Sequence, residues 1–153
     1  MRVQDLRSRL VAPKEDMTVA LKSHELVPTG YTPLDQQHEV QIELMDRLDA
    51  ALRAGLDPEA VWDALDRLVE HLRAHFASEQ RLMRLFRYPM AETHVLEHEH
   101  VFNLLDRLRT RCAQNDARLS GEVLEGLRRW LVDHVETRDV PLGQFLMGQD
   151  GKA

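Results

Sequence analysis

Two pairs of potential metal ligands with the same spacing lie in the middle of the chain. His75 and Glu79 are four residues apart, and so are His94 and His98. On an α-helix, side chains four residues apart lie on one face, about 6 Å apart along the axis, so each pair can bind one ion. The segment between the pairs, residues 87–89, ends in a proline and predicts a reversal of the chain. The two pairs are therefore expected to face each other across antiparallel helices.

Apolar residues recur at three- and four-residue steps around these pairs, which is the pattern of amphipathic helices. Asp57 is well placed as an N-cap before Pro58, and Ser120 as the N-cap of a later helix. Pro141 is expected to end the last helix, because a proline inside a helix lacks the backbone donor. The predicted helices cover about 34–55, 58–86, 90–115 and 121–140.

Short connections between four helices make sequential neighbours antiparallel. The sequence therefore predicts an all-α, up-down-up-down antiparallel four-helix bundle over 34–147. An N-terminal arm over 1–33 and a C-terminal tail over 148–153 flank it. The arm is expected to pack on the bundle, dock a protein partner or mediate self-association. In this topology the start of the first helix and the end of the last helix join the two pairs, which adds His38, His134 and Asp139.

Five histidines and two carboxylates thus converge on core positions in one half of the bundle. Buried polar groups are costly unless they are satisfied, and a single core histidine usually has a hydrogen-bond partner. The joint pattern instead indicates metal ligands. Imidazole and carboxylate donors suit iron, zinc, copper or manganese, and seven ligands exceed those of one tetrahedral zinc. The set fits two metal ions bridged by two carboxylates.

The segments that carry these residues resemble the hemerythrin family, specifically the bacterial hemerythrins. The motifs are Asp35-x-x-His38, His75-Phe76-x-x-Glu79-x-x-Leu82-Met83, Tyr88-Pro89-x4-His94-x3-His98 and Trp130-Leu131-x-x-His134-x4-Asp139. The resemblance covers about residues 34–147. It implies a non-haem di-iron site that binds dioxygen reversibly, as an oxygen carrier, store or scavenger that is not an enzyme.

The resemblance also implies how the two iron ions are held. A coordinatively saturated iron would be bound by His94, His98 and His134. An iron with an open position would be bound by His38 and His75, and an oxo or hydroxo group would bridge the two irons beside Glu79 and Asp139.

The implied oxygen pocket is lined by Gln41, Ile42, Phe76, Trp130 and Leu131. Gln41 stands one helical turn after the first ligand, where the family usually has leucine. Its amide either turns away to a backbone partner or hydrogen-bonds a ligand or water at the open iron. Leu142 replaces a tyrosine that is common in the family, which removes a hydroxyl group beside the site.

The remaining histidines are not expected to be ligands. His71, one turn before His75, is expected to be a satisfied neighbour, although a place in the pocket stays open. His100 points away from the ligand face, and His24 lies in the arm. Cys112 falls on an apolar stripe, where a small buried side chain is expected.

The composition is that of one globular domain, with 153 residues of which 43% are hydrophobic and 30% charged. A net charge of -6 gives no basic surface for nucleic acid or for an anionic membrane. Residues 1–6 carry charges where a signal peptide would be apolar, and no apolar run is long enough to cross a bilayer. We therefore expect a cytoplasmic protein.

Two other classes of metal site share parts of the pattern. Residues 94–98 spell H-x-x-E-H, a metalloprotease motif, but a protease would leave the histidines of the other helices without a purpose. A ferritin-like oxidase needs two Glu-x-x-His motifs, and only Glu97-x-x-His100 is present. An oxygen or redox sensor and a di-iron oxidase or peroxidase share the expected fold and ligands, so both stay open as alternatives.

Overall fold

The computed structural model describes residues 26–55 and 57–150, and these residues fold as helices joined by short turns. His24 and most of the expected arm lie outside the described residues. The helices are α1 (Thr32–Arg53), α2 (Pro58–Leu85), α3 (Ala91–Ala113) and α4 (Ala117–His134), followed by a π-helical turn (Val135–Asp139) and α5 (Val140–Asp150).

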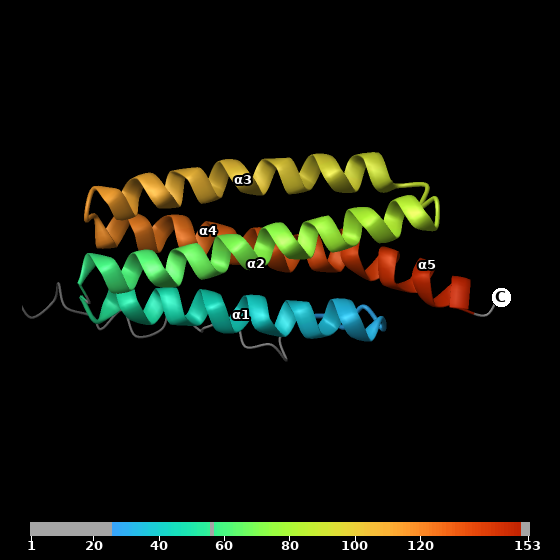
Figure 1. Cartoon of the computed structure of the whole chain (residues 1–153), viewed down its shortest axis with the longest axis horizontal. Helices are drawn as coiled ribbons and strands as arrows, with labels where there is room; N and C mark the ends of the chain where they lie inside the picture. The colour runs from blue at the N-terminus through green and yellow to red at the C-terminus, as the bar shows by residue number, and fades with distance from the viewer. Residues whose placement is uncertain (1–25, 56, 151–153) are drawn as a thin grey trace, which may run out of the picture.

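The four long helices form a closed ring of antiparallel neighbours. α1 and α3 each pack on both α2 and α4, and the four lie side by side along the length of the molecule (Figure 1). The predicted all-α four-helix bundle is confirmed. α5 continues α4 beyond the turn that joins α2 to α3, at the end of the bundle where α1 begins (Figure 1).

Aspartates cap two of the helix starts. The Asp57 side chain accepts a hydrogen bond from the Ala60 N–H at 3.0 Å and starts α2, as predicted. The Asp116 side chain accepts from the Leu119 N–H at 3.0 Å and starts α4 one turn earlier than expected. The prediction that Ser120 is the N-cap is therefore wrong. Asp116 is an equally good cap, and starting there buries Ser120 completely within the helix.

The prediction that Pro141 ends the last helix is also wrong. Val140, the residue before it, keeps helical angles of φ -59 and ψ -50, and α5 runs on to Asp150. The π-helical turn explains this continuation. The Val140 N–H donates to the Val135 carbonyl, five residues back, so the helix is wider where the proline ring would otherwise meet the preceding turn.

The polar half of the bundle lies between two apolar clusters. The larger cluster fills the rest of the bundle and includes Ile42 of α1. His38 lies one turn before Ile42, nearer the end of the bundle where α1 begins. A smaller cluster closes that end and consists of Leu34, Met83, Leu142 and Leu146. Because α5 supplies two of these four residues, its continuation past the π-helical turn covers the polar half from outside.

The segment that leads into α1 is fixed against α5. Both the N–H and the hydroxyl of Thr29 donate to Asp35 Oδ1 at 2.8 Å. Gly143 allows the close approach, since a β carbon at that position would lie 2.6 Å from the Thr29 carbonyl oxygen. In the described ranges, no helix is both long and apolar enough to cross a membrane.

Candidate metal centre

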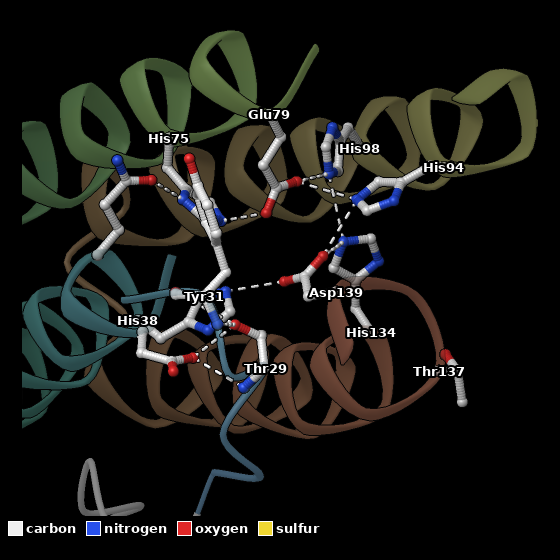
Figure 2. A network of polar contacts seen from close by, with 12 residues as sticks. Thr29, Tyr31, His38, His75, Glu79, His94, His98, His134, Thr137 and Asp139 are labelled. Carbon is white, nitrogen blue, oxygen red and sulfur yellow. Dashed lines mark hydrogen bonds and ion pairs between the residues drawn. The ribbon is translucent and has the colours of Figure 1, made fainter. Parts of the chain in front are cut away.

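Glu79 and Asp139 lie in the middle of the polar half of the bundle. His38 and His75 are on one side of the two carboxylates, and the three other predicted ligands are on the opposite side (Figure 2). All seven side chains are buried, with at most 3% exposed. The structure thus brings together every residue that the sequence predicts to bind metal.

The carboxylate of Glu79 links the histidines of α2 and α3. Its Oε1 atom lies 2.9 Å from His75 Nε2. Its Oε2 atom lies 2.9 Å from the Nε2 atoms of both His94 and His98.

The carboxylate of Asp139 links the histidines of α1, α3 and α4. Its Oδ2 atom lies 2.8 Å from His38 Nε2, and its Oδ1 atom lies 3.1 Å from the Nε2 atoms of His94 and His134. Each carboxylate therefore contacts histidines on both sides of the site with its two oxygen atoms.

The donor atoms form two groups, each compact enough for one ion, with all donors of a group within 4.8 Å of one another. One group has five members: Glu79, His94, His98, His134 and Asp139. The other has four: His38, His75, Glu79 and Asp139. The groups share both carboxylates, and one group has three histidines where the other has two different ones.

Many of these close contacts are not hydrogen bonds. His38 Nε2, His75 Nε2, Glu79 Oε1 and both oxygens of Asp139 are buried and have no hydrogen-bond partner in the described chain. Each such atom costs about 1–3 kcal/mol unless something satisfies it. Two ligands bound at right angles, each at about 2.1 Å from one ion, lie about 3 Å apart. The distances and directions therefore fit a pair of bound metal ions.

The π-helical turn sets the position of Asp139. Residues five apart on an α-helix lie about 140° apart around the axis, so Asp139 would point away from His134. In a π-helix the hydrogen bonds span five residues, so residues five apart lie much closer to one face than on an α-helix. The two side chains therefore share a face, with His134 Nε2 3.1 Å from Asp139 Oδ1.

The electrostatics of the site favour charged carboxylates. Burial alone would raise the pKa of Glu79, but His75 and the neighbouring histidines outweigh it and hold this pKa well below its ordinary value. The pKa of Asp139 is lowered in the same way, against burial and the charge of Glu79. Burial lowers the pKa of His94, but the two carboxylates raise it to about 9. Without metal, a proton on His94 therefore offsets part of the carboxylate charge.

Comparison with known proteins places this site in a family. The model of the hemerythrin HHE cation-binding domain matches residues 29–141. The chain belongs to the hemerythrin family. It is 32% identical over 110 residues to a bacteriohemerythrin of Stenotrophomonas maltophilia, covering 72% of this chain and 71% of the relative. It is 33% identical over 115 residues to a bacteriohemerythrin of Ralstonia nicotianae, covering 75% and 80%.

A solved structure of a hemerythrin variant supports the fold. It superposes with a TM-score of 0.70 at 23% identity, over 77% of this chain and 89% of the hemerythrin chain. The family binds di-iron, and the cluster of histidines and carboxylates that such a centre needs is present here.

Two hydrogen-bond partners of the predicted hemerythrin ligands were not predicted from the sequence. Gln37 Oε1 lies 2.6 Å from His75 Nδ1, and Glu97 Oε2 lies 2.8 Å from His134 Nδ1. The Arg138 Nε–H donates to the other oxygen of Glu97 at 2.6 Å. The spacing of Glu97 could have indicated this role, because Glu97 lies one turn after His94 on the side of α3 that meets α4. Such partners fix which ring nitrogen is free to bind metal.

Replacing Glu97 with alanine is expected to weaken iron binding by about 10- to 100-fold, because His134 loses the partner that orients its ring. Competition with a chelator, followed by elemental analysis, measures the change. Glu99→Ala, at an exposed position on the same helix, is the matched control and should bind iron as the parent does. Equal affinity of the Glu97 variant and the parent would contradict this role.

Two of the five residues predicted to line the hemerythrin oxygen pocket stack on ligand rings. Phe76 stacks on His98 with ring centroids 4.0 Å apart, and Trp130 stacks on His134 at 4.5 Å. The other three are fully or almost fully buried and comprise Gln41, Ile42 and Leu131. Their role as a pocket stays a prediction.

The other residues singled out in the sequence are placed as follows. His71 is satisfied, with Nε2 3.0 Å from the Gln37 carbonyl oxygen. His100 is exposed. Cys112 is buried in the larger cluster, as predicted, and burial raises the pKa of its thiol. Leu142 lies in the small cluster at the end of the bundle.

Proposed function

We propose that this chain is a non-haem di-iron protein that binds dioxygen reversibly and serves as an oxygen carrier, store or scavenger. The observation that carries the proposal is the inequality of the two donor groups, five against four, around two shared carboxylates. The relationship to bacteriohemerythrins supports iron as the metal.

The donor count supports one open position. We assign His94, His98 and His134 to one iron, and His38 and His75 to the other, with both carboxylates as bridges. With one bridging oxygen atom, the first iron would have six ligands and the second would have five. Six is a full octahedral set, so the second iron retains room for one small ligand.

The surrounding side chains suit binding without further reaction. When bound, the iron pair supplies the electrons for reversible binding of dioxygen. The apolar clusters on both sides of the site exclude water, which limits proton leakage to a bound ligand. The stacked rings of Phe76 and Trp130 hold His98 and His134 in place. These features favour a binding protein over an enzyme.

Oxygen uptake by protein loaded with ferrous iron under anaerobic conditions tests this function. The proposal predicts uptake of about one dioxygen per iron pair, and its return when the solution is purged with argon. Zinc-loaded protein is the control and should take up none. Continued consumption of dioxygen or of peroxide would instead indicate an oxidase or peroxidase. Permanent oxidation after one uptake would indicate a redox sensor.

A further inference from the structure

Gln41 is a buried amide without a partner. Its side chain is 0% exposed, and neither its Oε1 nor its Nε2 atom has a hydrogen-bond partner among the described residues. It lies on the buried stripe of α1 between His38 and Met45. Helix interiors of this kind normally hold leucine or isoleucine, because an unsatisfied buried amide is costly.

The helix geometry directs this amide toward the metal centre. Gln41 is three residues after His38, hence about 4.5 Å farther along the axis and on the same face. Side chains on an α-helix lean toward its N-terminus, so the Gln41 side chain leans back toward the turn that carries His38.

Contacts between α1 and α2 place the same turn beside His75. His71 Nε2 reaches the Gln37 carbonyl oxygen at 3.0 Å, and Gln37 Oε1 reaches His75 Nδ1 at 2.6 Å. Gln37 is one turn before Gln41. The rings of His38 and His75 have centroids 5.1 Å apart. Gln41 therefore lies about one turn of α1 away from the two histidines of the four-member donor group, toward the C-terminal end of that helix.

We propose that the Gln41 amide N–H donates a hydrogen bond to a small anion bound at the open position of the iron held by His38 and His75. This inference rests on the proposed function, because it needs that iron. A ligand with a terminal acceptor atom satisfies the donor that the protein leaves unpaired. A leucine at this position would offer such a ligand no hydrogen bond. Gln41 is thus a specificity-determining residue that favours anionic ligands.

Azide, a small linear anion, is the probe of this proposal. Gln41→Leu is expected to weaken azide binding to the diferric protein by about tenfold or more, the usual effect of losing one hydrogen bond to a charged group. Gln41→Glu keeps the size and removes the donor at neutral pH, so it should weaken azide binding at least as much. Gln36→Leu makes the same substitution at an exposed position of α1 and should leave binding unchanged.

Three further measurements test this role, and the first of them separates it from that of an ordinary core residue. The infrared stretch of bound azide should shift between H2O and D2O in the parent and not in Gln41→Leu. Metal-free Gln41→Leu should unfold at a higher temperature than the metal-free parent, because the unpaired amide is gone. Its ferrous form should also oxidise more slowly in air.

Iron content distinguishes the failure of this inference from that of the proposed function. If Gln41→Leu holds its iron pair and binds azide as tightly as the parent, the amide does not contact the ligand and the inference is wrong. The proposed function then stands. If the parent itself holds no iron pair, the proposed function fails and the inference fails with it.

Discussion

Replacing Glu79 with glutamine is expected to reduce bound iron from about two ions per chain to less than one. Glu79 contacts a histidine of each donor group, at 2.9 Å on both sides, and belongs to both groups. A neutral amide cannot supply an anionic bridge with two equivalent oxygens. Elemental analysis of protein loaded anaerobically and then desalted measures the loss.

A matched variant guards against a general effect of removing one charge. Glu70→Gln makes the same change at an exposed position of α2 and should leave the iron content at the level of the parent. Circular dichroism shows whether each variant keeps its helices. A folded Glu79 variant that retains the full iron pair would contradict the bridging role.

The second large effect is a pH-dependent difference in stability between metal-free and iron-loaded protein. Without metal, Glu79 and Asp139 have lowered pKa values in the folded protein. Their contribution to folding stability is therefore complete above the ordinary pKa values of these groups, and it is lost as the pH falls through the lower folded values. His94 has a pKa raised to about 9. The contribution of His94 to folding stability is complete below about pH 6.5 and is lost as the pH rises through 9.

Iron-loaded protein should not lose stability between pH 6 and 9 as the metal-free protein does. An imidazole must be neutral to bind metal, so below pH 9 binding displaces a proton from His94. Metal affinity should therefore rise with pH up to about 9, by about tenfold per pH unit for one released proton. Melting temperatures of both forms between pH 6 and 9 test this. A constant difference between the two forms across that range would show that no proton is displaced.

The ligands on α2 and α3 could be predicted from the sequence because an α-helix fixes what a four-residue spacing does. The pairs His75 and Glu79, and His94 and His98, lie on one face wherever the helix is regular. The antiparallel ring of helices followed from the short connections, which leave sequential neighbours no other simple arrangement. Both are local rules, and the structure obeys them.

Other features could not be derived from local rules. The topology predicted Asp139 as a ligand but not how it reaches the site: it is five residues after His134, a spacing that fails on an α-helix and works here because of the π-helical turn. That turn also lets the helix pass Pro141, which local propensity predicts as an end. The partners Gln37 and Glu97 depend on which flanks of two helices meet, and single-sequence periodicity does not report that.

The choice between Asp116 and Ser120 as the cap of α4 illustrates a third limit. Both residues are good N-caps, and local propensity does not rank them. In the structure Asn115 takes a left-handed backbone with φ 53, and the chain turns directly into Asp116 as the cap. The helix then begins one turn earlier, without any change at the metal end.

The visible absorption spectrum of reduced, anaerobic protein of known iron content tests the central claim most directly. Spectra are recorded before air, after air and after return to argon. We predict a charge-transfer band that appears with dioxygen, disappears under argon and returns on a second exposure, in protein that holds about two irons per chain. Prompt conversion to a stable diferric spectrum that argon does not reverse would contradict reversible oxygen binding.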